Sequence, residues 1–408
     1  MIRWVLLLLA LSPSTWASEF ALGASDKDAT VKVGCLFPLG GRSGLYGQDS
    51  AVGIRLAFEW LEMQSVEYPP IRVLIADSSS KASKATRLAR DFIRKDKARF
   101  ICGVVNSDIA LQVAKVAEDE KAFFIGTDHA SSKLTGTNVS PYYFRVNNNT
   151  QQSMHAAASY IKEKFKTIKA DQPLRISYIG PDYDYGYQTW QDLRTSLEKK
   201  GVDFEIVTAL WPRLYESDYT PYLKALLEKP TDLIVNSLWG GDLIAFVRQA
   251  NQTHLFRHAR FANFDTGSNY DVLAALGDDM PDGLILSSRH HNNWPDTKYN
   301  QWFIKRFKAL SGRYPSYAAE GAYSGMLAIA NVMAEVGVDA KDDEIRSALQ
   351  QLTISLPEDP QGFTSFMDAE KHQLQQVIAI GVTMPNTAFP PATHMLGDWR
   401  IYYPQSDQ

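Results

Sequence analysis

The 408-residue sequence is short of several features that would each indicate a particular kind of protein. Its two cysteines occur without the CxxC spacing of zinc or redox sites, so neither role is expected. The glycine-rich phosphate motifs GxGxxG and GxxxxGK[ST] are missing from its first glycine-rich turn, which argues against a nucleotide-binding enzyme. The net charge is −4 without blocks of like charge, so nucleic acid and anionic membranes are not expected partners.

Long apolar runs are also missing, apart from Val5–Leu11 near the N-terminus. This run is too short to span a bilayer, which takes about 20 residues. It follows Arg3 and precedes a small-x-small pattern at Thr15-Trp16-Ala17, so residues 1–17 are interpreted as a cleaved signal peptide. No cysteine follows that could carry a lipid anchor. The mature chain is therefore expected to leave the cytoplasm in soluble form.

What the sequence does contain is a repeated alternation of apolar strands and amphipathic helices. Continuous apolar strands are typical of parallel sheets covered on both faces, and the apolar residues between them recur with helical spacing. The pattern predicts open parallel α/β sheets with right-handed crossovers. The expected strands are Val31–Phe37, Ile71–Ala76, Phe100–Val105, Ala122–Gly126, Leu174–Ile179, Leu233–Ser237, Arg260–Asn263 and Leu284–Ser287.

The alternating units fall into two series, which an extended segment at Tyr142–Thr150 separates. We interpret this segment as a hinge between two α/β lobes, because an Asn/Thr helix start follows it. The last third of the chain is expected to return to the first lobe and then to the second. The predicted lobes are residues 30–147 plus about 288–356, and residues 148–287 plus about 357–403. The helices and strands expected in this last third are Lys298–Ser311, Tyr317–Val336, Asp342–Leu352, Thr364–Phe366 and Gln375–Val382.

Each of the two cysteines, Cys35 and Cys102, lies inside an apolar strand. Export would permit a disulfide between them. Two buried free thiols are nevertheless the favoured interpretation, because free cysteine is often buried.

Polar residues follow the predicted strands of the first lobe. The glycine-rich turn Pro38–Gly47 allows close backbone approach, either to a ligand or within a tight turn. A helix start with a serine hydroxyl can bind an anion or a carbonyl group, although simple helix capping explains the same residues. Such side chains gather where an open α/β sheet places its crevice. The candidate ligand-binding residues of this lobe are Tyr46, Asn106, Ser107, Asp128, His129 and Ala130.

Aromatic residues and one acid follow the strands of the second lobe. Aromatic walls with one carboxylate suit a small ligand that carries a cation or an amide. Partial burial in the lobe surface is the alternative for each aromatic residue. The pair His290-His291 has no metal-type spacing, and no nucleophile set stands out, so neither a metal, nor a cofactor, nor catalysis is expected. The candidates in this lobe are Tyr183, Tyr185, Trp239 and Asp265.

The order of four segments resembles a known family. The segments are VKVGCLFPLGGRSGLYGQDSAVG, ICGVVNSDIALQVA, ISYIGPDYDYGYQ and RFANFDTG, and the resemblance extends from about Val31 to the C-terminus. The sequence is similar to type I periplasmic substrate-binding proteins of the branched-chain amino acid (leucine/isoleucine/valine) and amide class, which serve ABC transporters. This implies two Rossmann-like lobes with parallel sheets joined by a three-crossover hinge. It also implies a monomer in the periplasm, with a small-molecule ligand and the membrane subunits of a transporter as partners.

The resemblance also assigns roles to individual residues. Ser107 matches a serine that holds the ligand carboxylate, Tyr185 and Trp239 match aromatic residues at the ligand, and Asp265 matches an acid that meets the ligand ammonium. Each of these roles is an expectation that rests on the resemblance alone.

The sequence departs from the family where an Ala-x-Thr site would contact the ligand, because Asp128 and Ala130 stand there. The added carboxylate would repel an anion unless His129 or Arg42 pairs with it. The expected ligand therefore shifts from an aliphatic amino acid towards an amide, an amine or a polar aromatic solute. The predicted function is an exported solute receptor that binds a small polar ligand (an amino acid, amide, amine or polar aromatic solute) in a cleft between the lobes and delivers it to an ABC transporter. A sensing module of the same fold is the alternative, and an exported α/β enzyme is disfavoured.

Overall fold

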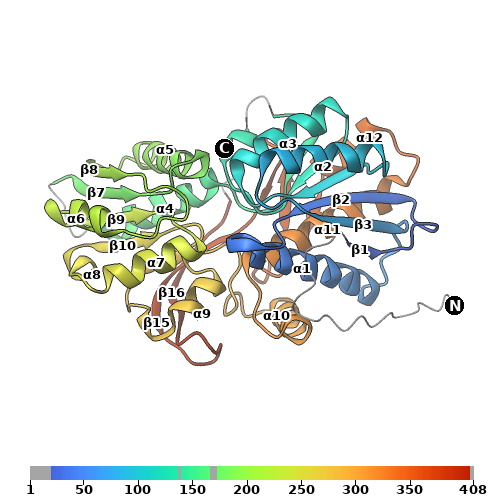
Figure 1. Ribbon diagram of the computed structural model, residues 1–408. Coiled ribbons are helices and arrows are strands. Elements are labelled where there is room, and N and C mark those ends of the chain that lie inside the picture. The colour runs from blue at the N-terminus through green and yellow to red at the C-terminus, as the bar shows by residue number, and fades with distance from the viewer. Residues whose placement is uncertain (1–19, 137–138, 166–171, 405–408) are drawn as a thin grey trace.

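The computed structural model describes residues 20–136, 139–165 and 172–404 and consists of two lobes side by side (Figure 1). Each lobe is built around its own sheet, and both sheets are mainly parallel. This confirms the predicted two-lobed α/β architecture. The predicted signal peptide at residues 1–17 lies outside the described residues. In the part of the chain that is described, no helix has the length and apolarity needed to cross a membrane.

The first sheet has nine strands in the order β1-β3-β2-β4-β5-β6-β14-β13-β12. The run from β3 to β14 is parallel, whereas β1, β13 and β12 pair with their neighbours antiparallel. The strands are β1 (Phe20–Gly23), β2 (Val31–Phe37), β3 (Ile71–Asp77), β4 (Phe100–Gly103), β5 (Phe123–Gly126), β6 (Tyr143–Arg145), β12 (Thr353–Ile354), β13 (Ser365–Asp368) and β14 (Gln373–Gln375).

The second sheet has seven strands in the order β16-β15-β11-β10-β9-β7-β8. The strands from β11 to β8 are parallel, and the last two strands of the chain add an antiparallel pair at the other edge. The strands are β7 (Leu174–Ile179), β8 (Phe204–Leu210), β9 (Leu233–Asn236), β10 (Arg260–Asn263), β11 (Ile285–Ser287), β15 (Ile378–Pro385) and β16 (His394–Tyr402).

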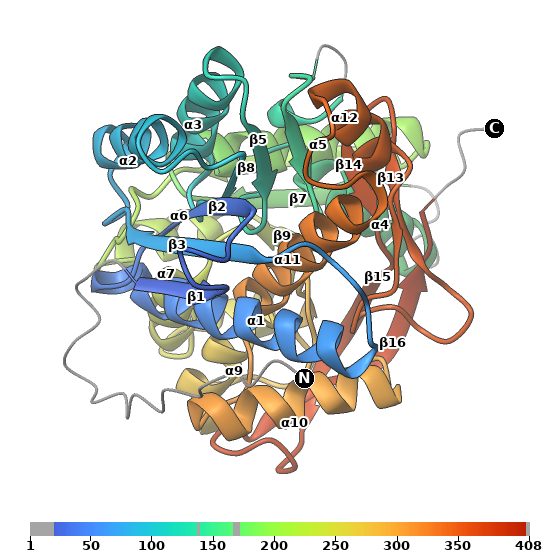
Figure 2. The same ribbon diagram turned by 90° about the vertical axis from the view of Figure 1, so that its right-hand side faces the viewer.

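Helices cover both faces of each sheet, as Figure 2 shows for the first lobe. There α2 and α3 pack on one face, and α1, α10, α11 and α12 pack on the other. In the second lobe, α4 and α5 cover one face and α6 to α9 the other. The helices are α1 (Gly44–Met63), α2 (Ala82–Arg94), α3 (Ser107–Asp119), α4 (Thr150–Phe165), α5 (Asp184–Lys199), α6 (Thr220–Glu228), α7 (Gly240–Ala250), α8 (Leu255–His258), α9 (Tyr270–Leu276), α10 (Lys298–Ser311), α11 (Tyr317–Val336) and α12 (Asp342–Gln350).

The chain passes between the two sheets three times: after β6, after β11 and after β14. The third crossing comes later than the expected boundary near residue 357. The reason is that the segment 353–375 forms β12, β13 and β14, which extend the first sheet rather than the second. The carboxyl ends of the central strands of both sheets point to the region between the lobes, where strand-end loops meet.

Cys35 and Cys102 form a disulfide, so the favoured interpretation of two free thiols is wrong. Cys35 lies on β2 and Cys102 on β4, and these strands are neighbours in the first sheet. Their register places the two cysteines directly opposite each other, with 4.4 Å between the Cα atoms. The sequence shows both strands, but the pairing of the two cysteines depends on this register.

Close chain packing and backbone conformation require glycine at two positions of the turn Pro38–Gly47. A Cβ atom on Gly47 would lie 2.0 Å from the carbonyl oxygen of Pro38, and Gly41 has a φ of +70°. Both positions therefore favour glycine for reasons internal to the turn. The turn leads into α1 and so directs Tyr46, in the first turn of that helix, towards the second lobe.

Candidate ligand-binding site

A small pocket lies between the two lobes at the carboxyl ends of their strands. Its cavity volume is about 10 Å³, which leaves room for no more than one water molecule. A ligand larger than a water molecule therefore needs the lobes to move apart. The residues that line this interlobe pocket are Val105, Ser107, Asp128, His129, Ala130, Tyr183, Tyr185, Trp239, Thr266, Arg289 and Tyr317.

The start of α3 forms the wall on the side of the first lobe. The Asn106 side chain caps this helix by accepting a hydrogen bond from the Ile109 N–H, at 3.2 Å. The buried Ser107 hydroxyl accepts from the Ser131 N–H at 3.3 Å, so its own hydrogen is left to donate. The N–H groups in the first turn of a helix lack partners within the helix and carry its positive end. This wall therefore offers hydrogen-bond donors to a ligand.

The loop that leads into α3 is strained at Val104, a β-branched residue with a φ of +68°. Such a conformation is rare for valine and persists only where the surroundings impose it. His129 supplies that support, because its backbone N–H and its Nδ1 both contact the Val104 carbonyl oxygen, at 3.2 and 2.8 Å. Its Nε2 contacts the Tyr143 hydroxyl at 2.7 Å. His129 was expected to bind ligand; it lines the pocket, but both of its ring nitrogens are engaged within the protein, Nδ1 by the Val104 loop and Nε2 by the Tyr143 hydroxyl.

Aromatic rings from both lobes close over the pocket. The Tyr46 ring stacks on Tyr317 with 5.6 Å between centroids and meets the edge of Trp239 at 5.7 Å. Tyr183 and Tyr185 lie 6.0 Å apart on the side of the second lobe. The Trp239 Nε1 is buried and lies beside the Tyr183 hydroxyl, without a well-aligned hydrogen bond in the described structure. A buried donor without a well-aligned hydrogen bond costs stability, so this N–H favours a ligand that brings an acceptor.

Asp265 and Arg289 form a buried ion pair behind these rings. The Arg289 Nε donates to Oδ1 at 3.1 Å and its Nη2 to Oδ2 at 2.5 Å. Asp265 also accepts from the Tyr185 hydroxyl at 2.7 Å and from the Ser153 hydroxyl at 2.9 Å. Burial alone would raise the pKa of Asp265, but the guanidinium and these donors hold that pKa below its usual value. Both carboxylate oxygens are therefore occupied by the protein itself.

This arrangement differs from the expected role of Asp265 as a partner for a ligand cation. Asp265 does not line the pocket, and the guanidinium of Arg289 takes the position that a ligand cation would need. Arg289 also donates to the Asp128 carbonyl oxygen across the lobes. Its guanidinium carbon lies 4.7 Å from the ring centroid of Tyr317, so the cation–π position is filled as well.

Asp128 is the acid that faces the pocket. Its Oδ1 lies 3.8 Å from the Arg289 Nη1, and its Oδ2 has no hydrogen-bond partner within the described ranges. Burial, opposed by Arg289 and reinforced by Asp265, raises the pKa of Asp128 to about 7. The expected partners His129 and Arg42 do not neutralise it. His129 supports the Val104 loop, and Arg42 donates to the Tyr215 carbonyl oxygen at 3.2 Å.

Further contacts join the lobes on either side of the pocket. The Tyr46 hydroxyl donates to the Asp271 Oδ2 at 2.8 Å, and the hydroxyls of Ser43 and Tyr215 lie 2.9 Å apart. On the other side, the Ser132 hydroxyl donates to Asp192 at 2.8 Å. These contacts hold the lobes together, so they would have to break for a ligand to enter.

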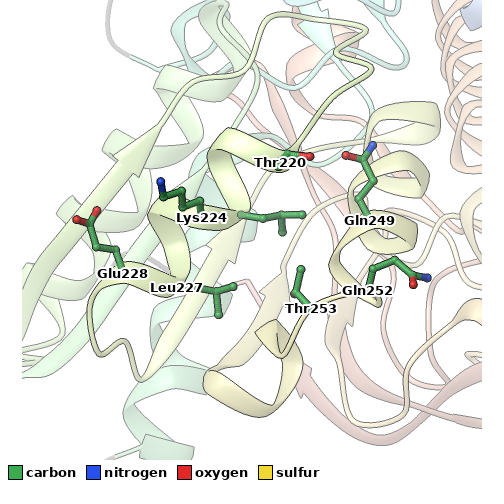
Figure 3. Close-up of a pocket in the computed structure, with 8 residues that line it drawn as sticks. Thr220, Lys224, Leu227, Glu228, Gln249, Gln252 and Thr253 are labelled. Atoms are coloured by element: carbon green, nitrogen blue, oxygen red, sulfur yellow. The ribbon is translucent and has the colours of Figure 1, made fainter.

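A larger hollow of about 660 Å³ opens on the surface of the second lobe (Figure 3). It lies between α6, with Thr220, Lys224 and Leu227, and the end of α7 with Gln249. It belongs to one lobe, so lobe closure would not enclose a ligand there. The interlobe pocket is the better candidate despite its smaller volume.

A second group of buried acids lies in the first lobe, away from the pocket. Glu320 and Glu358 are both buried; burial raises the pKa of Glu358 to about 8 and that of Glu320 well above its usual value. The His290 Nδ1 lies 3.4 Å from a Glu358 oxygen, and burial lowers the pKa of His290 to about 3. Among the residues described, no group of three or more His, Cys, Asp or Glu side chains is arranged to hold a metal ion.

The structure brings most of the predicted site residues together. Seven of them line the pocket, Tyr46 packs on its aromatic wall, Asn106 caps the helix at its edge, and Asp265 lies behind it. Sequence reasoning missed four lining residues: Val105, Thr266, Arg289 and Tyr317. Arg289 follows β11, so a strand-end search extended to that strand would have found it. Tyr317 begins a helix after a crossing, and no local pattern marks it. The seven lining residues are Ser107, Asp128, His129, Ala130, Tyr183, Tyr185 and Trp239.

Two α/β lobes with three crossings and a buried interlobe pocket define the class of two-lobed binding proteins. A sequence profile described as "periplasmic binding protein" matches residues 30–383, and the chain belongs to this family. Among curated relatives, a Leu/Ile/Val-binding protein homolog 8 of Brucella suis is 24% identical over 359 residues, which cover 85% of this chain and 86% of the relative.

Solved structures share the fold. A solute-binding protein of an ABC transporter from Rhodopseudomonas palustris, in complex with 3,4-dihydroxybenzoic acid, aligns with a TM-score of 0.79 and 20% identity, over 91% of this chain and 97% of that one. An amino acid ABC transporter substrate-binding protein from Pseudomonas fluorescens aligns with a TM-score of 0.77 and 22% identity, over 91% and 96%. At these identities the likeness concerns the fold.

Proposed function

We propose that the protein is an exported receptor that traps a small polar solute in the interlobe pocket and passes it to the membrane subunits of an ABC transporter. The ligand has a flat, largely apolar body that fits between aromatic rings, and it carries at least one hydrogen-bond acceptor. Its role is binding without catalysis. We further propose that the signal peptide is removed, that the mature protein acts in the periplasm and that it is a monomer.

The observation that carries this proposal is the composition of the pocket. Both lobes contribute side chains, so binding and lobe closure are linked. Donors without well-aligned protein partners, above all the Trp239 Nε1 and the start of α3 at Ser107, face the same space as the stacked rings of Tyr46 and Tyr317. Similar structures support the ligand class, because one of them was solved with a dihydroxybenzoic acid.

The first test identifies the solute. Native mass spectrometry of the purified protein, followed by release and identification of any bound molecule, is combined with thermal-shift screening of amino acids, amides and aromatic acids. We expect a bound solute to raise the melting temperature and to change the scattering profile towards a more compact particle. A protein that binds none of the screened solutes and carries none through purification would contradict the proposal.

The second test locates the binding site with a matched pair of variants. Trp239→Phe removes the indole N–H and keeps an aromatic ring, and we expect the ligand Kd to rise about tenfold, which corresponds to about 1.4 kcal/mol for one lost hydrogen bond. Trp211→Phe makes the same change outside the pocket and should leave Kd within about twofold of the wild-type value. Equal effects of the two variants would place the ligand elsewhere.

Delivery to a transporter is tested by co-purification. A tagged, ligand-loaded protein should retain ABC transporter membrane subunits. Retention of a receptor of another kind would favour the alternative sensing module. Size-exclusion chromatography with light scattering checks the monomer.

A further inference from the structure

The charge balance of the pocket indicates which chemical group the ligand presents; this step rests on the proposed function. Arg289 and Asp265 neutralise each other through two hydrogen bonds at 3.1 and 2.5 Å. The exposed fraction of their side chains is 5% and 1%. What remains for a ligand is the side chain of Asp128 and a set of donors. The donors are the Trp239 N–H, the Ser107 hydroxyl and the start of α3.

The pocket offers few free groups that could bind a cationic ligand. Both oxygens of Asp265 are occupied, and the guanidinium of Arg289 already lies against the face of Tyr317. A second cation would also lie close to Arg289 and to the positive end of α3, and both would repel it. Among the described residues that line the pocket, Asp128 supplies the acidic oxygen without a partner, Oδ2, that would attract it.

The pocket offers an anionic ligand three kinds of hydrogen-bond donor, but it also contains the Asp128 carboxyl. Ionised Asp128 would repel a ligand carboxylate, whereas protonated Asp128 has a hydroxyl to donate. Its Oδ2 is buried, lies in the lining of the pocket and has no hydrogen-bond partner in the ranges described, so that atom is available for such a bond. A hydrogen bond between a carboxylic acid and a carboxylate is charge-assisted and strong.

We propose that the pocket selects a carboxylic acid, and that Asp128 binds the ligand carboxylate as a neutral acid which donates its proton. Above neutral pH the complex then contains one more proton than the separate partners. That proton comes from solvent, and no covalent bond of the ligand changes. Asp128 serves as a specificity-determining residue, because it disfavours amines and couples acid binding to pH.

The groups that face Asp128 support a neutral acid. Arg289 lies nearest and favours the ionised form, whereas Asp265, Tyr46 and Tyr317 face it from the other elements. Burial outweighs the guanidinium and raises the pKa of Asp128 to about 7 before any ligand charge is added. A ligand carboxylate raises it further, since a like charge disfavours ionisation.

The test compares three monosubstituted benzenes of similar size: benzoate, benzamide and benzylamine. Isothermal titration calorimetry measures each Kd at pH 6 and at pH 8 with the full mature chain. We expect benzoate to bind most tightly. Asp128 has a pKa of about 7 in the closed form and a lower one when the lobes are open, so the Kd of benzoate should rise at least about tenfold from pH 6 to pH 8. Titrations at pH 8 in buffers of different ionisation enthalpy should show that close to one proton is taken up.

A variant pair separates Asp128 from other buried acids. Asp128→Asn presents an amide donor that cannot titrate, so benzoate should still bind, with a Kd that changes less than about twofold between the two pH values. Asp242→Asn alters another buried acid, whose pKa is raised to about 6 but which does not line the pocket, and it should keep the tenfold change.

Several outcomes would overturn this inference. They are tighter binding of benzylamine than of benzoate, tighter benzoate binding at pH 8 than at pH 6, a pH dependence that persists in Asp128→Asn, or no binding of benzoate at all. The proposed receptor function is judged separately. A non-acidic solute identified by mass spectrometry would leave that function intact and refute only the selection of a carboxylic acid.

Discussion

Replacement of Arg289 by methionine should destabilise the protein strongly, because it leaves the buried Asp265 carboxylate without its cation. The change removes two hydrogen bonds to Asp265, the bond to the Asp128 carbonyl oxygen and the contact with Tyr317. Loss of one partner of a buried ion pair costs about 3–5 kcal/mol. For a domain of the size of one lobe, each kcal/mol lowers the melting temperature by about 2–4 °C. We therefore expect a decrease of at least 6 °C or so in calorimetry without ligand.

The controls follow from the same ion pair. Arg248→Met removes an exposed pair with Asp279, whose side chains are 51% and 57% exposed, and should cost no more than about 1 kcal/mol. In the double variant Arg289→Met/Asp265→Asn no uncompensated charge is left, so most of the lost stability should return. Recovery in the double variant distinguishes an unpaired charge from a simple loss of packing.

The stability of the Arg289→Met variant should also change with pH in the direction opposite to that expected for the wild type. In the wild type the pKa of Asp265 is lowered, so its contribution to stability is present above the unfolded pKa of about 3.9 and is lost as the pH falls through the lower folded pKa. Without Arg289, burial raises that pKa, and the variant should lose stability as the pH rises above about 4. A variant that stays within 1 kcal/mol of the wild type at neutral pH, or that shows no change in pH dependence, would refute the reasoning.

Three further predictions concern the remaining features of the structure. Removal of the Cys35–Cys102 disulfide, which closes a 67-residue separation, should lower the unfolding free energy by about 4 kcal/mol in guanidinium titrations, and an unchanged midpoint would contradict it. Burial raises the pKa of Glu358 to about 8, so the stability that its protonated form contributes is lost as the pH rises from about 4.3 to 8. The melting temperature of Glu358→Gln, measured across that range, should therefore depend less on pH than that of the wild type. Tyr46→Phe removes the bond to Asp271 across the lobes, and X-ray scattering should show a shift towards the open form worth about 1–2 kcal/mol.

Much of the fold could be predicted because its central strands are buried on both faces. Continuous apolar runs gave the bounds of β2, β7 and β10 as the structure has them, and helical spacing did the same for α10. Edge strands were missed. β8 has no buried residue and β16 has only two, Met395 and Leu396, so neither has the continuous buried apolar run of a central strand. The pairing of such strands depends on neighbours that are distant in the sequence.

The candidate site was predicted unevenly for a related reason. Residues that follow a strand, such as Ser107, Tyr185 and Trp239, reach the pocket because parallel strands end at one edge of a sheet. The ion-pair partner of a buried acid is harder to predict. Asp265 was expected to bind a ligand cation, but its partner is Arg289, on the neighbouring strand-end loop. Only the register of β10 and β11 brings the two side chains together.

The position of this ion pair explains why lobe closure and protonation are linked. Asp265 and Arg289 both follow strands of the second sheet, so their pair survives when the lobes separate. Asp128 follows β5 of the first sheet, and separation exposes its carboxyl to water, which restores a pKa near the ordinary value. Closure buries that carboxyl between Arg289 and Tyr317. The proton is therefore taken up in the closing step. A carboxylic acid that favours the closed form should bind more weakly as the pH rises.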